Sequence, residues 1–224
     1  MHLTKNKKKQ IEGIDFNKSY PVNEAIKLLK EKKFVNFDES VEVSINTGID
    51  SKQSDQNVRG SFVPPHGLGK KVDIAVFAQG KSAEEAKSLG VKKVGGEDLV
   101  LALQEKIDVD VIIATPDMMS VVSKIAKVLG PKGLMPNPKT GTVTNDVKST
   151  IQNINKGLVA YKNDKAGTIH AALGKISFDE NHLNENINSF MEEIKKIKPS
   201  GVKGNFINSV FISSTMGFGL KVEV

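Results

Sequence analysis

The hydrophobic pattern changes twice along this 224-residue chain, and this change constrains the fold more than any other feature. Residues 40–47 alternate between apolar and polar side chains, which is typical of a strand with one exposed face. Residues 72–78 and 109–114 are instead nearly continuous apolar runs, the pattern of strands that are covered on both faces. After Gly157 the alternating style returns. The chain therefore combines two kinds of sheet.

Helical patterns separate the continuous apolar runs in the middle of the chain. They occur at 82–89, 97–106, 117–129 and 146–156. Apolar strands that alternate with helices predict a mainly parallel sheet with helices on both faces. We therefore expect residues 68–156 to form a three-layer, Rossmann-like α/β domain.

Both ends of the chain show a mixed α+β pattern. In 1–67 a helical pattern precedes the alternating strand, and in 157–224 short strands flank one long helix. The simplest arrangement joins the two segments into one antiparallel sheet with helices on one side. We therefore predict a discontinuous α+β outer domain interrupted by the inserted α/β domain. The alternative is a single compact mixed domain.

The chain would cross between these domains near 65–69 and 156–158. Both crossings contain glycine, which permits backbone conformations that other residues avoid, so we expect a hinge there. The residues expected to form the hinge are Pro65, Gly67, Gly69 and Gly157.

The start of the long C-terminal helix fits a capping box. Ser177 would accept a hydrogen bond from the backbone three residues on, and Glu180 would reach back to it. Pro199 would end the helix. The apolar face of this helix consists of Leu183, Ile187, Met191, Ile194 and Ile197.

The chain is moderately basic, with 32 basic and 26 acidic residues and a net charge of +6. A basic balance favours nucleic acid or another anionic partner, although a lysine-rich genome would produce the same excess. The charge is spread evenly. The two outer segments together carry 19 basic and 16 acidic residues, and 68–156 carries 13 and 10. Neither predicted domain is a dedicated basic block.

Several chemistries are excluded or disfavoured by what the sequence lacks. The absence of cysteine excludes disulfides, thiolate metal sites and a cysteine nucleophile. The four histidines lie too far apart for a local metal motif. Residues 1–10 are lysine-rich with no apolar stretch behind them, so we expect no secretory signal. With no run of 18 apolar residues, we expect a cytoplasmic protein that does not span a membrane.

The phosphate-binding motifs are incomplete as well. The stretch 67–71 lacks the preceding glycine and the Ser or Thr of a phosphate loop, and Gly95-Gly96 lacks the third glycine of a dinucleotide fingerprint. We therefore expect no cofactor and no catalytic residue. An enzyme that uses the α/β domain to bind a nucleotide is the alternative.

Two loops are candidates for binding. Residues 130–141 contain three prolines and three glycines, with Lys132 and Lys139 and no acid. Proline fixes φ, so such a loop is stiff and suited to a phosphate backbone or a fixed contact. The second candidate is 213–217, where three consecutive hydroxyl side chains could reach phosphate oxygens and ribose hydroxyls. A plain hairpin loop is its alternative.

These stretches, in this order, resemble the bacterial form of the ribosomal protein L1 family, which belongs to the mobile lateral stalk of the large subunit. The likeness runs nearly the whole length of the chain. The residues that carry it are 54–60, 65–70, 95–97, 114–117, 129–143, 163–165, 169–171 and 215–217.

The resemblance implies a function as well as a fold. It implies the outer domain, the inserted domain and the hinge described above. It implies that the protein is a monomer within the ribosome and binds the large-subunit rRNA stalk, mainly through the outer domain. It also implies assistance in the release of deacylated tRNA from the exit site, and repression of translation of its own operon mRNA.

The resemblance also carries over a set of RNA-binding residues. Asn36 and Phe218 depart from the family pattern, which commonly has Lys and Pro there, so a phosphate contact could be missing and the last turn looser. Lys132 and Lys139 are weaker candidates for a secondary RNA contact. The expected RNA-binding residues of the outer domain are Glu24, Phe37, Ser40, His170, Ser177, Ser213, Ser214, Thr215, Met216 and Gly217.

Overall fold

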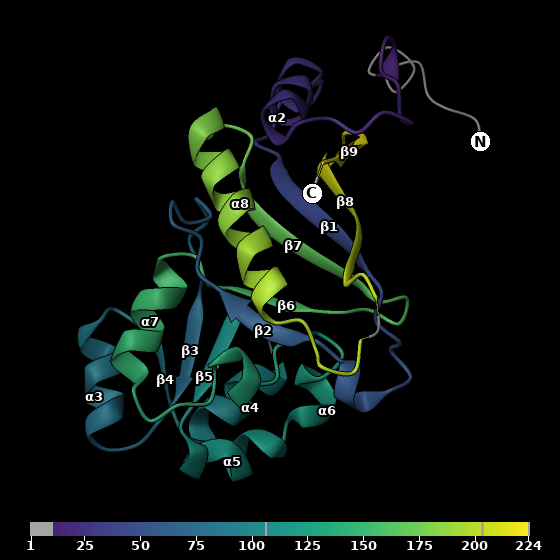
Figure 1. Ribbon diagram of the computed structural model, residues 1–224. Helices are drawn as coiled ribbons and strands as arrows, with labels where there is room; N and C mark the ends of the chain where they lie inside the picture. Colours follow the sequence, from purple (N-terminus) through teal and green to yellow (C-terminus); the bar gives the residue numbers. More distant parts are fainter. Residues whose placement is uncertain (1–10, 106, 203, 224) are drawn as a thin grey trace. The chain divides into compact units, whose positions relative to one another are not determined.

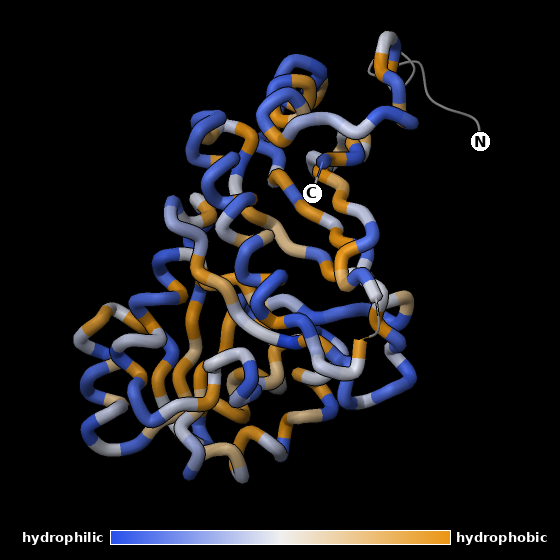
Figure 2. The backbone as a smooth tube through the Cα atoms, viewed as in Figure 1, coloured by the Kyte–Doolittle hydropathy of each residue, from blue (hydrophilic) through white to orange (hydrophobic). Residues whose placement is uncertain are grey.

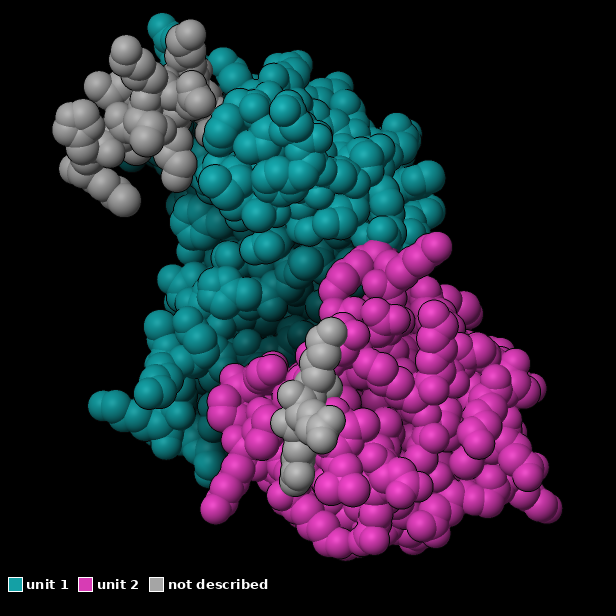
Figure 3. Space-filling model, turned by 180° about the vertical axis from the view of Figure 1, so that it is seen from behind, with its two compact units in different colours: residues 1–69, 159–224 teal, residues 70–158 magenta. Residues whose placement is uncertain are grey.

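The computed structural model describes residues 11–105, 107–202 and 204–223. Residues 1–10, for which the sequence predicts no secretory signal, lie outside these ranges. The chain divides into two compact units: unit 1 comprises residues 1–69 and 159–224, and unit 2 comprises residues 70–158 (Figure 3). Unit 1 contains an antiparallel sheet and unit 2 a separate parallel sheet, as the two hydrophobic patterns predict.

The main sheet of unit 1 has four strands. Its second strand, β1, runs antiparallel to the strand on each side of it. This strand alternates as predicted, with Val41, Val43 and Ile45 buried. Its partners come from the far end of the chain. The order across the sheet is β7 (Thr168–Lys175), β1 (Ser40–Thr47), β8 (Ile207–Ser214) and β9 (Gly219–Val222).

Two helices, α2 (Val22–Glu31) and α8 (Glu180–Lys196), cover the buried face of this sheet (Figure 1). The predicted apolar face of α8 is confirmed, since all five of its residues are in or against the core of unit 1. In a second, two-stranded sheet, β2 (Arg59–Phe62) pairs antiparallel with β6 (Val159–Lys162). A short 3₁₀ turn, η1 (Ser54–Gln56), precedes β2 in the chain.

Unit 2 contains a parallel sheet in the order β4 (Lys93–Gly95), β3 (Ile74–Phe77), β5 (Val111–Ala114). Every side chain of β3 is buried because the strand contributes to a core on each face, and Figure 2 colours β3 and β5 as hydrophobic. The helices are α3 (Lys81–Ser88) and α7 (Val147–Asn155) on one face, and α4 (Glu97–Glu105), α5 (Met119–Ser123) and α6 (Ala126–Leu129) on the other.

The prediction of a single helix over residues 117–129 is wrong. A 3₁₀ turn, η2 (Pro116–Met118), leads into α5, and the chain turns again before α6. The amides of Lys124 and Ile125 donate to carbonyls three residues back instead of four. Three-residue bonding of this kind tightens and ends a helix, and the β-branched residues just before it favour the α-helix weakly.

A buried asparagine ties the loop at 64–69 to α8. The Asn186 side chain is fully buried, and its Oδ1 accepts a hydrogen bond from the His66 amide at 3.1 Å. Its Nδ2 donates to the carbonyls of Gly67 and Leu173, at 3.2 and 2.8 Å. The His66 ring also stacks on His182, with centroids 4.1 Å apart. These contacts join His66 and Gly67 to α8.

We expect Asn186→Ala to lower the free energy of unfolding of unit 1 by about 1–3 kcal/mol, the usual consequence of leaving buried polar groups unpaired. Both tyrosines of the chain, Tyr20 and Tyr161, belong to unit 1, so tyrosine fluorescence during urea unfolding reports on this unit. Asn188→Ala, on the exposed side of α8, is the matched control. Equal effects of the two substitutions would contradict the assignment.

Candidate nucleic-acid interface

The turn between β8 and β9, residues 213–217, lies against the start of β1. The Thr215 amide donates to the Ser40 carbonyl at 3.2 Å, and the Ser40 amide donates to Thr215 Oγ1 at 3.0 Å. The Gly217 amide closes the turn on the Ser214 carbonyl at 3.2 Å. Two residues that are 175 positions apart in the sequence are therefore held in fixed register.

An acid that the sequence analysis did not single out lies beneath this turn. Glu39 is fully buried, and its Oε1 accepts hydrogen bonds from Ser214 Oγ at 3.1 Å and from the Met216 amide at 2.8 Å. Its carbonyl accepts from the Ile176 amide at 2.8 Å. The only local sign of this role is an acid placed directly before a half-buried strand.

The side chains of the turn are not equally accessible. Met216 is 44% exposed, and Thr215 is exposed as well. Ser213 is half-buried. Ser214, in contrast, is 6% exposed and directs its hydroxyl to Glu39, so the expectation that this hydroxyl faces RNA needs correction. In the described structure Ser214 holds the turn from inside.

The segment before β1 and the segment after β7 join the same cluster. Lys175 Nζ donates to Ser40 Oγ at 2.9 Å. Ser177 donates to the Asp38 carboxylate twice, from its hydroxyl at 2.8 Å and from its amide at 3.2 Å. Phe37 is 50% exposed beside them in the chain. Three distant segments thus form one surface at one end of the sheet.

The predicted capping box at the start of α8 is wrong. The N-cap residue is Asp179, and its side chain makes no capping hydrogen bond. Ser177 lies two residues earlier, where the Asp38 carboxylate accepts from both of its donors. A charged acceptor bound twice is a stronger partner than one backbone amide, so Ser177 joins the sheet end instead of capping the helix.

Two further predicted residues lie outside this hydrogen-bonded cluster. Glu24 is exposed in the first turn of α2, and no hydrogen bond joins it to the cluster within the described ranges. His170 is exposed on β7, directly across from Ser44 of β1. The ten predicted residues therefore do not form one hydrogen-bonded face, because within the described ranges hydrogen bonds connect only those at the sheet end to one another.

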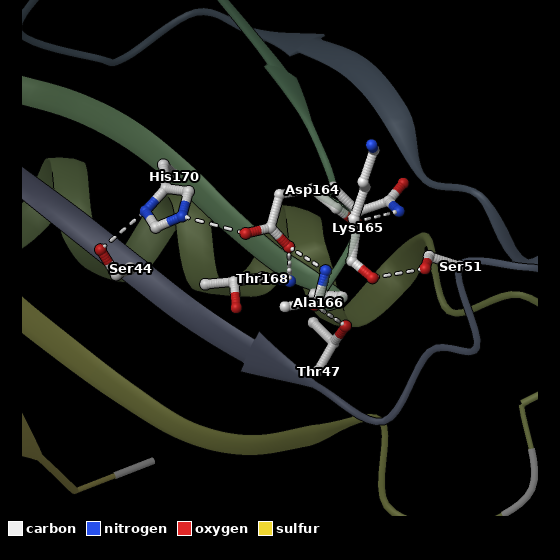
Figure 4. A network of polar contacts seen from close by, with 10 residues as sticks. Ser44, Thr47, Ser51, Asp164, Lys165, Ala166, Thr168 and His170 are labelled. Atoms are coloured by element: carbon white, nitrogen blue, oxygen red, sulfur yellow. Dashed lines mark hydrogen bonds and ion pairs between the residues drawn. The ribbon is translucent and has the colours of Figure 1, made fainter.

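His170 belongs to a separate polar network on the open face of the sheet (Figure 4). Its Nδ1 lies 3.0 Å from Ser44 Oγ, and its Nε2 lies 3.8 Å from Asp164 Oδ2. A catalytic triad needs a buried acid that orients the imidazole through a short hydrogen bond. Asp164 is exposed, and its Oδ1 instead accepts from the amides of Ala166 and Thr168. The network orients the His170 ring and shapes a turn.

Phe218, where the sequence analysis expects a looser turn, anchors the end of the turn. Its side chain is 8% exposed and belongs to the core of unit 1. Its ring meets that of Phe16 edge to face, with centroids 6.3 Å apart. These contacts hold the end of the turn against the core.

The loop with three prolines lies in unit 2 and is stiffened by its own hydrogen bonds. Asn137 Oδ1 accepts from the Lys139 amide at 2.8 Å, and the Asn137 amide donates to Thr142 Oγ1 at 2.8 Å. The 3₁₀ turn η3 (Pro138–Thr140) lies between them. Lys132 and Lys139 are exposed on this loop. They belong to a different unit from the sheet-end cluster.

A cavity of about 130 Å³ in unit 2 bears on the nucleotide-binding alternative. Small-molecule sites usually occupy roughly 300–1,000 Å³ and, in α/β sheets, lie at the carboxyl ends of the strands. This cavity lies at the opposite ends, where Asp73 begins the approach to β3 and Lys92 precedes β4. It therefore does not support a nucleotide site.

Two kinds of feature are absent from the described ranges. No cluster of three or more acidic or histidine side chains has the geometry of a metal site. No helix there is both long and apolar enough to cross a membrane.

Comparison with known proteins gives consistent matches. The family described as "Ribosomal protein L1p/L10e family" matches residues 28–218. The chain is 50% identical over 223 residues to a large ribosomal subunit protein uL1 of Ruthia magnifica subsp. Calyptogena magnifica, covering 99% of this chain and 96% of that one. It is 52% identical to the uL1 protein of Thermosipho africanus, covering 94% and 91%. The uL1 protein of Coxiella burnetii is 50% identical, with 99% and 96% covered.

The Asp164 turn predicts a pH dependence of stability. The Thr168 amide donates to the carboxylate, which lowers the pKa of Asp164, and the Ala166 amide and the His170 ring act in the same direction. A lowered folded-state pKa means that the ionised carboxylate favours folding above its ordinary pKa of about 3.9. This contribution is lost as the pH falls through the folded-state pKa.

We therefore expect Asp164→Asn to be less stable than the wild type near pH 6, with a difference that shrinks as the pH falls toward 2. Urea unfolding across this range, followed by tyrosine fluorescence, measures it. Glu192→Gln, which removes an exposed carboxylate from the body of α8, is the control for charge loss alone. A difference independent of pH would be inconsistent with this role for Asp164.

Proposed function

The chain belongs to the ribosomal protein L1p/L10e family. From this premise we propose that it binds large-subunit rRNA at the lateral stalk, through the sheet end of unit 1. Members of this family are structural ribosomal proteins, so the chain is not an enzyme, and it works on the ribosome in the cytoplasm. We call the proposed contact area the turn surface: Phe37, Ser40, Ser177, Ser213, Thr215, Met216 and Gly217, with Ser214 holding it from inside.

The observation that carries this proposal is the exposure of Phe37, Thr215 and Met216 on a rigid base. Phe37 and Met216 are large apolar side chains, 50% and 44% exposed, and each lies on a segment fixed by hydrogen bonds to the other strands. Apolar side chains of this kind pack on bases and sugars, and hydroxyls recognise the ribose 2′-OH that distinguishes RNA from DNA.

The charges around the turn surface favour contacts to sugars and bases over contacts to phosphates. Asp38 lies exposed beside it, Glu39 is buried beneath it, and Lys175, which is close by, is bound to Ser40. Phosphates are repelled by carboxylates, whereas 2′-OH groups and base N–H groups can donate. The net charge of +6 supplies a general attraction that weakens as salt rises.

The remaining roles extend this binding mode. In our proposal unit 2 is an inserted domain, and residues 65–69 and 156–158 form the hinge through Pro65, Gly67, Gly69 and Gly157. Gly157 has a φ of 101°, which non-glycine residues rarely adopt. Lys132 and Lys139 make secondary RNA contacts. A single copy acts on the ribosome, and it assists the departure of deacylated tRNA from the exit site.

The same surface would serve regulation. An RNA that presents the stalk structure in the leader of the protein's own operon would compete for the turn surface, because recognition depends on the local RNA shape and sugars and not on the ribosome. We therefore propose that excess protein represses translation of its own operon mRNA.

We expect Thr215→Ala and Met216→Ala each to weaken binding to a stalk rRNA transcript by roughly 1–3 kcal/mol, the usual loss for one specific contact. Filter binding at several salt concentrations measures both the affinity and its salt dependence. Because neither side chain is charged, the salt dependence is expected to stay that of the wild type. Ser120→Ala, an exposed hydroxyl in unit 2, is the matched control. Wild-type affinity in both turn variants would rule out the turn surface.

We expect excess protein to lower the output of a reporter that carries the operon leader, and Thr215→Ala to relieve this repression. Reporter protein is measured against reporter mRNA, so that a translational effect is separated from a change in transcript level. Repression that persists in Thr215→Ala would show that regulation uses a different surface from the one proposed.

A further inference from the structure

A carboxylate without access to solvent is an unusual neighbour for a surface that binds RNA. Glu39 is fully buried, and its Oε1 accepts from Ser214 Oγ and the Met216 amide. Its Oε2 is also buried and has no hydrogen-bond partner among the described residues. Burying an ionisable group with one oxygen unpaired is unfavourable for folding. The residue therefore needs a reason beyond filling the core.

The position of Glu39 supplies that reason. Its carbonyl is bound by the Ile176 amide, and the next residue, Ser40, is bound to Thr215 through both backbone and side chain. Glu39, directly before β1, and Ser40, the first residue of β1, thus hold three consecutive residues of the turn. Both donors bound by Glu39, Ser214 Oγ and the Met216 amide, point inward toward the strand.

The inward hydrogen bonds determine what the turn presents outward. With the Ser214 hydroxyl and the Met216 amide directed at Glu39, the Thr215 and Met216 side chains are left on the exposed side. Without this acceptor both donors would be unpaired, and the turn could lower its free energy by rotating them toward water. Such a rotation would change the direction of the side chains offered to RNA.

We propose that Glu39 is a positioning residue for RNA binding, which acts as a buried hydrogen-bond acceptor and never touches the RNA. This proposal rests on the proposed function for the identity of the ligand. The claim that Glu39 fixes the conformation of the turn does not depend on that ligand. The acceptor matters, not the charge. Glutamine keeps a carbonyl oxygen at the same place, whereas alanine removes it.

The first test needs no RNA. Amide hydrogen exchange of Met216 in the full chain, followed by NMR, is expected to be slow in the wild type and in Glu39→Gln, and faster in Glu39→Ala. Ile194 is buried in the same core, near the C-terminal end of α8. Ile194→Ala is therefore the control for a general loss of stability. Equal Met216 exchange in Glu39→Ala and Ile194→Ala would overturn the proposed role of Glu39.

The second test uses a transcript of the stalk segment of large-subunit rRNA. We expect Glu39→Ala to bind at least about tenfold more weakly than the wild type, the equivalent of one buried group left unpaired. Glu39→Gln is expected to bind close to the wild type, and Ile194→Ala to bind normally while it is folded. If Glu39→Ala does not fold, Ser214→Ala removes only one of the two bonds and is expected to show an intermediate loss.

A double-mutant cycle separates positioning from structural support. Thr215→Ala is expected to weaken binding less in the Glu39→Ala background than in the wild type, because the side chain is already misdirected. In the Ile194→Ala background its effect is expected to be unchanged. Additive effects of Glu39→Ala and Thr215→Ala, or a Glu39→Gln variant as weak as Glu39→Ala, would overturn the proposal. Failure of the wild type to bind the transcript would instead refute the proposed function, and the exchange test would still decide the structural part.

Discussion

The antiparallel pairing of β1 with β7 and β8 is the interaction on which the rest of unit 1 depends. β1 comes from the first quarter of the chain, and both of its partners come from the last third. Their register brings the segments before β1, after β7 and after β8 to one end of the sheet. Each segment alone is a short polar turn, and the turn surface exists only because the pairing puts the three together.

Once the sheet is formed, two neighbouring acids fix its end. Asp38 binds Ser177 from one side, and Glu39 binds Ser214 and Met216 from the other. These carboxylates act as acceptors for hydroxyl and amide donors, in an area that we propose meets a polyanion. In the proposed binding mode, long-range attraction and local recognition are supplied by different groups. Lysines spread over the whole chain would give the first, and hydroxyl and apolar side chains would give the second.

Local patterning was sufficient to predict the elements, but not the contacts between them. The alternation in β1, the continuous apolar run of β3 and the apolar face of α8 each reflect a repeating period that a single sequence displays. Glu39 stands in the run Asp38-Glu39-Ser40, which reads like any exposed turn. Its burial depends on residues 175 and 177 positions away, and no local period encodes such contacts. The same reason accounts for Ser177, whose partner Asp38 lies 139 positions away. The break between α5 and α6 was missed because apolar spacing continues through it.

The measurement that tests the central claim most directly is a map of the RNA-bound surface. Backbone amide resonances of the full chain would be compared with and without the stalk rRNA transcript. We predict that the largest changes fall on Phe37, Ser40 and residues 213–217, with smaller changes at the exposed lysines of unit 2. Changes confined to unit 2, or spread over unit 1 with the turn surface unaffected, would contradict it.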